Sequence, residues 1–599
     1  MCGIVGYIGE KQAAPILLDG LSKLEYRGYD SAGVAVFDGK EIEVVKTKGR
    51  LQALSDRIDG GNKIKGTFGI GHTRWATHGE PSDVNSHPHT SESGKIAIVH
   101  NGIIENYVKL KEFLKGKGYH FVSETDTEVV AHLADYYYKG DLLDMVIKII
   151  AKVEGSYALG IVSSDNPDEL VAVRKDSPLI VGLGEGENFI ASDIPAILSY
   201  TRKVYLIEDN EIAVIKKDSV KLYNTEKEEI QKEVFQVDWD VSAAEKGGYE
   251  HFMFKEIMEE PDSVMKTISP VIKDGLIKFD KIPSRISIVG CGSAYHVGVV
   301  GKYIIEQLTG IPVEVDIASE YRYRNPILTD DTLVVVISQS GETADTLAAL
   351  RDSKKRGAKI FGIVNVVGSS IARESDEVLY TLAGPEIAVA TTKAYSTQLV
   401  SVYLLALSLM KAQGKLTPEM EKQYADELLS LPEKIQQVID NKEKIQYYAS
   451  QYFNSKSVFF IGRGLDYALS MEGSLKLKEI SYIHSEAYGA GELKHGTISL
   501  IEDGTLVMAM ATQEKLYDKM VSNIKEVKAR GAVVFAIAEE GHTAIEECSD
   551  AVLYIPKTNQ MFTPSLAVTA LQLFAYYVAS LNGCDIDKPR NLAKSVTVE

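Results

Sequence analysis

Cysteine, tryptophan, long apolar runs and excess positive charge are all scarce in this sequence. Its 599 residues include four cysteines, at positions 2, 291, 548 and 584, and two tryptophans. Four cysteines in a chain of this length are too few for a disulfide scaffold, and the lack of a CxxC pair excludes a zinc ribbon. The apolar run at 399–410 is too short to span a bilayer and is typical of a buried helix. A net charge of −19 argues against broad binding to nucleic acid or to anionic membranes.

The first residues also lack the basic region and long apolar stretch of a signal peptide. With so few cysteines, this predicts a soluble protein of a reducing compartment, most simply the cytoplasm, with no membrane and no nucleic-acid partner. Apolar residues make up 45% and charged residues 25%, as in ordinary globular proteins. The length predicts several domains.

Short β-rich segments separated by glycine and polar turns fill roughly the first 240 residues. We expect strands at 32–37, 42–46, 96–100 and 158–162, and a helix at 127–138. Strands this short and frequent predict packed antiparallel sheets. Residues 241–280 differ in character and are interpreted as a connector, with a helical segment at 255–260 that Pro261 ends.

An internal repeat marks the second half of the chain. From about residue 285 strands alternate with helices, which predicts parallel α/β units. The segment 286–292 parallels 458–464, and 355–363 parallels 528–537. Gly290 and Gly462 are 172 residues apart, and Gly357 and Gly531 are 174 apart. Two matches at nearly one spacing predict a duplicated domain, with the charged helix at 418–443 between the copies.

Cys2 is the first candidate nucleophile. Without Met1 its thiol and α-amine would belong to one residue. The amine, with a pKa of about 7.7–8.0, could take the thiol proton without a histidine partner. The alternative is a buried structural cysteine.

A polar cluster follows at 71–79, 87–89 and 100–102, and it holds five of the twelve histidines. A metal site and ordinary hydrogen-bonding histidines are both open, although no HExxH is present. Recognition of a carboxylate by Arg74 and oxyanion support by Asn101 and Gly102 are favoured. Asp126 opens a helix, where it could cap the helix or bind an ammonium group.

These motifs resemble the N-terminal-nucleophile glutamine amidotransferases. The resemblance rests on Cys-Gly-Ile-Val-Gly at 2–6, on the motifs around Arg74 and Asn101, and on Glu-Thr-Asp-Thr-Glu at 124–128. It implies a four-layer αββα sandwich in which the thiol attacks glutamine and releases ammonia. The implied roles are nucleophile for Cys2, oxyanion hole for Asn101 and Gly102, and glutamine binding for Arg74, Thr77, His78 and Asp126.

An anion site is predicted where the apolar run 333–337 ends. The loop Ser338-Gln339-Ser340-Gly341-Glu342-Thr343 follows it and leads into a helix. Hydroxyls, backbone N–H groups and a helix dipole can together cradle a phosphate, although an ordinary capped turn is the alternative. The matching place in the second copy, 508–513, lacks the hydroxyl cluster, so we expect the anion site in the first copy alone.

Ionisable residues crowd a helix and loop of the second copy. Glu472, Lys476 and Glu479 share one face of a helix expected at 468–480. A solvated row of salt bridges is the simpler interpretation, but the neighbouring groups at 484–496 favour acid–base chemistry. In the C-terminal tail, Lys594 could form a Schiff base with a ketose.

The second half resembles tandem sugar-isomerase (SIS) domains, which are parallel-sheet αβα, flavodoxin-like sandwiches. With the first half it resembles the glucosamine-6-phosphate synthase family, the isomerising glutamine–fructose-6-phosphate aminotransferases. This multidomain α+β and α/β resemblance implies a glutaminase domain at 2–240, a connector at 241–280, SIS domains at 281–425 and 448–589, and a closing tail at 590–599.

The family also implies substrates, roles and partners. The substrates are L-glutamine and D-fructose 6-phosphate, with no metal or other cofactor, in a homodimer whose partner can supply the residue at the His495 position. Ring opening falls to His495, imine formation to Lys594 and proton transfer to Glu479, with Lys476 in support. Trp75 would gate an ammonia channel and Arg590 would fix the tail. The implied phosphate ligands are Ser293, Ser338, Gln339, Ser340 and Thr343.

Two other functions remain open. One is an amidotransferase or deglycase-like enzyme that acts on a different sugar phosphate. The other is a non-catalytic sugar-phosphate sensor, which would leave Cys2, Glu479 and Lys594 without a task. The chain also departs from the family motif at 293–294, where Ser293 keeps a hydroxyl but Ala294 cannot donate a hydrogen bond.

Overall fold

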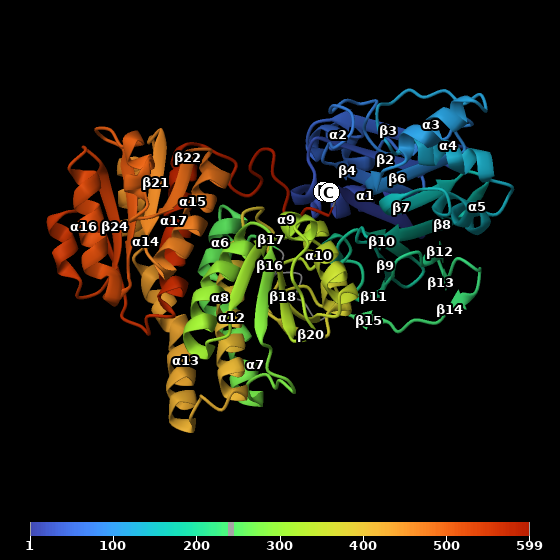
Figure 1. The fold of residues 1–599 in the computed structure, drawn as a ribbon. Coiled ribbons are helices and arrows are strands. Elements are labelled where there is room, and N and C mark those ends of the chain that lie inside the picture. The colour runs from blue at the N-terminus through green and yellow to red at the C-terminus, as the bar shows by residue number, and fades with distance from the viewer. Residues whose placement is uncertain (1, 238–244, 598–599) are drawn as a thin grey trace. The chain divides into compact units, whose positions relative to one another are not determined.

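The structure is a computed structural model that describes residues 2–237 and 245–597 (Figure 1). The chain divides into two compact units, Met1–Ala244 with Ala593–Glu599, and Glu245–Leu592. The first four residues of the predicted connector, 241–244, lie outside the described residues. Its remainder belongs to the second unit.

Two antiparallel sheets form the centre of the first unit. One has eight strands in the order β15-β11-β9-β10-β1-β4-β2-β3, and the other has seven in the order β14-β13-β12-β8-β7-β6-β5. The eight strands are β1 Gly3–Ile8, β2 Ser31–Phe37, β3 Ile42–Lys48, β4 Phe68–Arg74, β9 Ile180–Leu183, β10 Asn188–Ala191, β11 Lys203–Leu206 and β15 Phe235–Gln236. The seven are β5 His89–Thr90, β6 Ile96–Ile104, β7 Gly155–Ser163, β8 Asn166–Lys175, β12 Ile212–Lys216, β13 Ser219–Tyr223 and β14 Glu229–Ile230.

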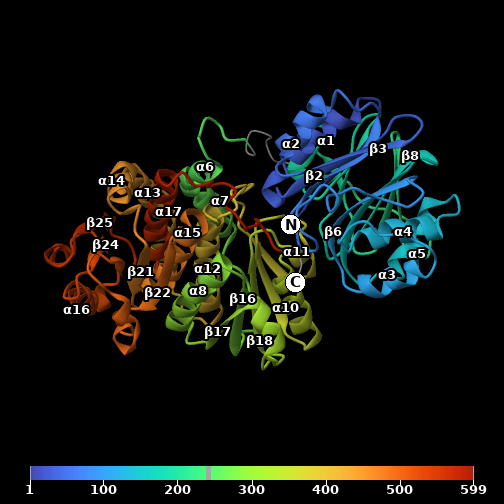
Figure 2. The same cartoon turned by 90° about the horizontal axis from the view of Figure 1, so that it is seen from above.

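Alternation along β6 shows how the layers pack. Ile96 and Ile98 enter a core shared with helices, whereas Ala97 and Val99 enter the core between the two sheets. Successive side chains of a strand point to opposite faces, so both faces of this sheet are covered. The helices are α1 Ala13–Ser22, α2 Leu51–Arg57, α3 Tyr107–Lys115, α4 Glu128–Tyr137 and α5 Leu142–Ile150. Figure 2 shows α1 and α2 on one side of the paired sheets and α3, α4 and α5 on the other. The predicted αββα sandwich is confirmed.

The second unit contains two five-stranded parallel sheets with the same strand order. The first is β17-β16-β18-β19-β20 and the second is β22-β21-β23-β24-β25. The strands are β16 Arg285–Gly290, β17 Val313–Ile317, β18 Thr332–Ser338, β19 Lys359–Val364, β20 Glu377–Tyr380, β21 Ser457–Gly462, β22 His484–Gly489, β23 Leu506–Ala511, β24 Val533–Glu539 and β25 Ala551–Ile555. This is the flavodoxin-like order, in which ligands bind beyond the carboxyl ends of the first and third strands in sequence.

Helices join the two sheets through one continuous apolar core. They are α6 Phe252–Met258, α7 Glu260–Asp274, α8 Ser293–Thr309, α9 Ala318–Tyr323, α10 Ala344–Lys355, α11 Ser370–Glu374, α12 Lys393–Ala412, α13 Pro418–Asp440, α14 Lys442–Tyr452, α15 Leu465–Ser481, α16 Tyr517–Lys528 and α17 Thr563–Leu581. The run 399–410 lies buried in α12, as predicted. Pro261 does not end a helix: it stands in the first turn of α7, where a missing N–H costs nothing.

Helix α17 is long and apolar enough to cross a membrane by length and composition. Yet 89% of its most apolar window is buried inside the second unit, as expected for a core helix. Polar contacts also hold it there. The buried carboxylate of Glu260 accepts hydrogen bonds from Thr569 of α17 at 2.7 Å and from Ser396 of α12 at 2.9 Å. Because these helices come from different copies, the carboxylate links the copies.

Candidate active sites

Cys2 lies just before β1, a central strand of the eight-stranded sheet. Its thiol is held by Trp75, whose backbone N–H lies 3.3 Å and whose carbonyl oxygen lies 3.5 Å from Sγ. Burial raises the pKa of the Cys2 thiol. The thiol therefore needs a nearby base before it can attack a carbonyl carbon.

Arg74 ends β4 with its side chain 3% exposed. Its Nη2 donates to the carbonyl oxygens of His78 and Gly79, the latter at 2.9 Å. Its Nη1 is buried and has no hydrogen-bond partner among the described residues. A substrate carboxylate would satisfy that donor, and this supports the predicted role of Arg74.

Asn101 and Gly102 lie on β6 near Cys2. The Nδ2 of Asn101 donates to the carbonyl oxygen of Cys2 at 2.9 Å. Gly102 has φ of +129°, and a Cβ there would lie 2.1 Å from the carbonyl oxygen of Ser156. A residue with a side chain does not fit this position. The backbone N–H of Gly102 and the side-chain amide of Asn101 are therefore two donors on adjacent residues.

The other predicted glutamine ligands differ in their surroundings. Thr77 is exposed, and its Oγ1 lies 3.4 Å from Nδ1 of the half-buried His78. Asp126 is 5% exposed, and its Oδ2 accepts a hydrogen bond from the backbone N–H of Ile104 at 2.7 Å. The capping alternative is wrong, because Thr127 is the N-cap residue of α4 and it makes no side-chain cap.

Four histidines of this unit are buried more deeply than their motifs indicate. His72, His87, His89 and His100 are all nearly fully buried. Burial lowers the pKa of each, so all four are neutral at physiological pH. Within residues 2–237 and 245–597 no group of histidine, cysteine and acidic side chains is arranged to hold a metal ion. His72, His89 and His100 lie on β4, β5 and β6, and His87 lies in the loop just before β5.

The loop after β18 gathers the predicted phosphate ligands. The Oγ of Ser338 accepts the N–H of Gly341 at 3.0 Å and lies 3.0 Å from Oγ1 of Thr343. The Oγ of Ser340 accepts the N–H of Glu342 at 3.2 Å. Gly341 has φ of +66°, and a Cβ there would meet the Ser369 hydroxyl at 2.0 Å. This tight hydroxyl-rich turn stands at the N-terminus of α10, where the helix dipole favours an anion.

Ser293, the remaining predicted phosphate ligand, bonds a side chain of the second copy instead. Its Oγ donates at 2.8 Å to Oε1 of Glu472, a carboxylate of the second copy. A hydroxyl has one proton, so this arrangement leaves none for a phosphate. The Nδ1 of His296 donates to the other oxygen of Glu472, also at 2.8 Å.

The three charged residues of α15 are not a solvated row. Glu472 and Lys476 are fully buried, and Nζ of Lys476 lies 2.6 Å from Oε2 of Glu479 and 3.5 Å from Oε1 of Glu472. Burial works to lower the pKa of Lys476, but the two carboxylates outweigh it and raise the pKa above its usual value. The Glu479 side chain is partly exposed.

The remaining predicted residues, His495, Arg590 and Lys594, are described by their own surroundings. His495 is exposed on a short 3₁₀ helix, Leu493–His495. Arg590 is held at the end of α15: its N–H donates to the Tyr482 hydroxyl at 2.8 Å, and its guanidinium lies 4.1 Å above that ring. Lys594 is half-buried in the segment Ala593–Glu599, which groups with the first unit.

Two buried carboxylates that the sequence analysis did not single out hold the segment before α12. Glu256 accepts the N–H groups of Ile387 and Ala388, at 2.6 and 3.2 Å. Glu386 accepts those of Thr392 and Ala394, at 2.9 and 3.0 Å. Charge-assisted bonds of this kind rigidify a loop. Spacing in the sequence offers no clue to the role of Glu256, since it lies about 130 residues from its partners.

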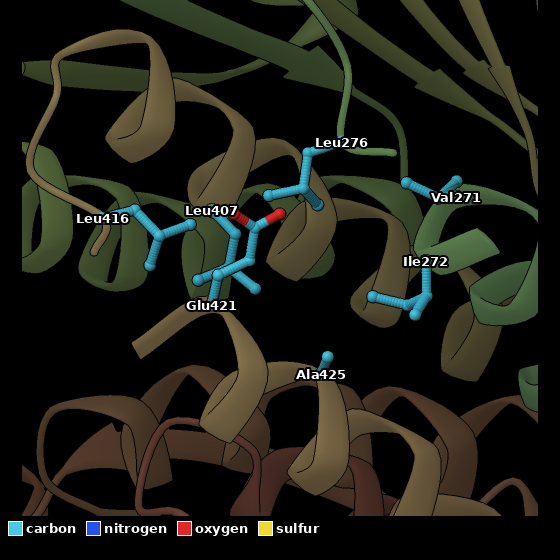
Figure 3. A pocket seen from close by; sticks show the side chains of 7 residues that line it. All are labelled: Val271, Ile272, Leu276, Leu407, Leu416, Glu421 and Ala425. Atoms are coloured by element: carbon cyan, nitrogen blue, oxygen red, sulfur yellow. The ribbon is translucent and has the colours of Figure 1, made fainter. Parts of the chain in front are cut away.

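One small pocket of the second unit lacks such chemistry. It lies between α7, α12 and α13 and is lined by Val271, Ile272, Leu276, Leu407, Leu416, Glu421 and Ala425 (Figure 3). Its single carboxylate, that of Glu421, pairs with Lys411 at 2.7 Å. An apolar lining with one neutralised charge carries no reaction.

Comparisons with known proteins match both units. The SIS domain family matches residues 281–408 and 451–581, and the glutamine amidotransferase domain family matches 72–199. A C-terminal domain of glucosamine-fructose-6-phosphate aminotransferase from Francisella tularensis superposes with a TM-score of 0.55 at 40% identity, covering 57% of this chain and 99% of that one.

Curated relatives align over the whole chain. Proteins from Caldanaerobacter subterraneus subsp. tengcongensis and Clostridium tetani are each 60% identical over 609 residues, and one from Thermus thermophilus is 47% identical over 606. Each alignment covers 100% of both chains, and each relative is named glutamine–fructose-6-phosphate aminotransferase (isomerizing). This chain therefore belongs to the isomerizing glutamine–fructose-6-phosphate aminotransferase family.

Proposed function

We propose that this enzyme makes glucosamine 6-phosphate and glutamate from fructose 6-phosphate and glutamine. The observation that carries the proposal is 60% identity over the full length with a relative named glutamine–fructose-6-phosphate aminotransferase (isomerizing). A thiol site in the first unit and a hydroxyl-rich loop in the second unit agree with it. The reaction balances: water consumed in hydrolysing glutamine is released when the ammonia condenses with the ketose.

In the first unit, the thiolate of Cys2 attacks the side-chain amide carbon of glutamine. Once Met1 is removed, the α-amine of Cys2 takes the thiol proton and returns it to the leaving ammonia. Asn101 and Gly102 donate to the oxyanion, and water then hydrolyses the thioester. The free Nη1 of Arg74 supports binding of the glutamine carboxylate, and the buried Asp126 supports binding of its ammonium group. Thr77 and His78 complete the glutamine site.

In the second unit, Ser338, Gln339, Ser340 and Thr343 bind the sugar phosphate. Hydrogen bonds to a charged group contribute about 1.5–3 kcal/mol each. We keep Ser293 out of this group and assign it to Glu472, to which it donates.

Carbonyl chemistry belongs to the other predicted residues. Lys594 forms an imine with the ketose, His495 assists ring opening, and Glu479 moves the proton from C1 to C2 of the amino-ketose. Lys476, 2.6 Å from Glu479, holds that carboxylate in place. This scheme uses neither a metal nor an organic cofactor. We also propose a cytoplasmic homodimer, with Trp75 gating ammonia transfer.

Product analysis with glutamine and fructose 6-phosphate tests the whole proposal. We expect glucosamine 6-phosphate and glutamate in equal amounts, and neither from Cys2→Ala with glutamine as the nitrogen source. Cys2→Ala should still bind fructose 6-phosphate. Glutamate without amino sugar would indicate a different sugar-phosphate acceptor.

Borohydride tests the imine. With fructose 6-phosphate it should trap one sugar on Lys594, and Lys594→Arg should stop both trapping and synthesis while the glutaminase reaction continues. Arginine keeps the charge but is no useful nucleophile at neutral pH. A sugar trapped on Lys476 or Lys494 would overturn the assignment.

A further inference from the structure

His72 is a buried strand residue to which the proposed reaction gives no task. It lies on β4, two residues before Arg74 and two after Ile70, which packs in the core between the sheets. Side chains two residues apart on a strand share a face. The His72 ring, fully buried, therefore projects from the eight-stranded sheet toward β6 of the seven-stranded sheet, where Asn101 lies.

The surroundings of His72 determine which ring nitrogen carries the proton. Its Nε2 lies 3.0 Å from the carbonyl oxygen of His100 and 3.0 Å from Oδ1 of Asn101. Both oxygens can only accept, so Nε2 must be the donor. The opposite nitrogen, Nδ1, is buried without a hydrogen-bond partner among the described residues. Burial lowers the pKa of His72 to about 3, so the ring is neutral with its proton on Nε2.

The orientation of the Asn101 amide follows from independent contacts. Its nitrogen must face Cys2, because the Cys2 carbonyl oxygen, 2.9 Å away, can only accept a hydrogen bond. Its oxygen must face His72, because Nε2 can only donate. A terminal amide rotates in a broad, two-fold potential and does not hold one orientation by itself. A flipped Asn101 would point oxygen lone pairs at the developing oxyanion.

A second histidine holds the His72 ring in place. The rings of His72 and His87 stack with centroids 4.2 Å apart and planes 19° apart. The Nδ1 of His87 accepts the backbone N–H of His100 at 3.3 Å. His100 precedes Asn101 on β6. The strand that carries Asn101 therefore also binds His87, the ring that stacks on His72.

We propose that His72 is a positioning residue for the glutaminase reaction: its Nε2–H fixes the Asn101 side-chain amide with the nitrogen toward Cys2. His72 contacts no reacting atom in this scheme and acts through Asn101. The inference rests on the proposed oxyanion role of Asn101.

Two substitutions separate the hydrogen bond from the ring. His72→Gln can place a donor near the position of Nε2, whereas His72→Met fills similar space without a donor. Both lose the stacking on His87. Removing an oxyanion donor costs about 10²–10³-fold in kcat. We expect His72→Met to lower the kcat of glutamine hydrolysis at least about tenfold with little change in KM, and His72→Gln to stay within about threefold of wild type.

A double mutant tests whether the effect passes through Asn101. In an Asn101→Ala background, His72→Met should lower kcat by less than about twofold, because no amide remains to be oriented. Equal losses in the Met and Gln variants, or a full loss in the double mutant, would overturn the proposal. His72→Leu repeats the test should His72→Met fail to fold.

The controls keep the two proposals apart. Wild-type protein without glutaminase activity would contradict the proposed function itself. Asn101→Ala with normal activity would remove the oxyanion role and this inference with it. Impaired Asn101→Ala with normal His72→Met would overturn the inference alone.

Discussion

The two parallel-sheet copies of the second unit share a scaffold and differ in what fills the loop after the third strand. Each first strand ends in a glycine turn of nearly identical conformation, with φ and ψ of 53° and −127° at Gly292 and 58° and −124° at Gly464. Two residues later the first copy has Ala294 and the second has Asp466. Asp466 accepts from the N–H and hydroxyl of Thr512 at 2.8 and 2.5 Å.

In the second copy, the carboxylate of Asp466 is thus bonded to the loop that corresponds to the hydroxyl-rich loop of the first copy. Ala294 has no side chain that could do the same. This supports the prediction of one phosphate site. Both copies keep the same strand order. In our proposal the first copy binds the sugar phosphate and helix α15 of the second copy supplies the acid–base groups. The contact from Ser293 to Glu472 joins the two.

Glu479→Gln should have the largest effect in the second copy. General acid–base catalysis contributes about 10²–10⁴-fold, so synthesis should fall by that factor while fructose 6-phosphate binding changes little. Lys476 stays paired through Glu472, 3.5 Å away, so the fold should persist. Steady-state kinetics and equilibrium binding check this. A change in KM with normal kcat would place binding, not chemistry, on this helix.

Ser340→Ala combined with Thr343→Ala should weaken sugar-phosphate binding in the first copy. Two lost bonds to a charged group correspond to about 3–6 kcal/mol, or roughly 10²–10⁴ in Kd. Isothermal titration with fructose 6-phosphate measures it. Thr512→Ala is the matched control, since this hydroxyl bonds Asp466. Similar losses of affinity from both variants would mean that both copies bind phosphate.

Asp466→Asn should change the pH dependence of stability. Burial raises the pKa of Asp466 to about 6, against about 3.9 in an unfolded chain. The folded state therefore binds the proton more tightly between about pH 4 and 6. Stability from this group is complete below about pH 4 and is lost as the pH rises through 6, by about 3 kcal/mol. Denaturant unfolding of wild type and variant at several pH values measures the difference. A difference independent of pH would contradict a buried, poorly solvated carboxylate.

Most of the strands and helices could be predicted because they depend on local patterns of apolar and turn residues in the sequence. The strands expected at 32–37 and 333–337 are confirmed as β2 and the centre of β18, and the helix at 127–138 is confirmed as α4 within a residue or two. The repeat predicted two copies of one fold, and both sheets have the same order. Hydrophobic period and turn residues suffice for this.

The sequence predicted which residues lie together in the candidate sites better than it predicted the individual contacts of each residue. Cys2, Trp75 and Asn101 do lie together, and so do Ser338 and Thr343. Pro261 was misread because a proline that ends one helix and a proline that opens the next look alike in a sequence. The capping role considered for Asp126 rested on the same local reasoning, and its carboxylate instead accepts a hydrogen bond from the backbone of Ile104, 22 residues away.

The sequence by itself determined the family, the duplicated scaffold and the residues that can carry chemistry, since these depend on residue type and on spacing along the chain. Only the tertiary structure decided that His72 contacts Asn101, that Ser293 donates to Glu472 and that Asp466 accepts from Thr512. Each of these contacts joins segments 29 to 179 residues apart. A hydrogen bond requires a favourable angle and a donor–acceptor distance correct to within a few tenths of an ångström. Only the packing of sheets and helices brings donors and acceptors so distant in sequence into this geometry.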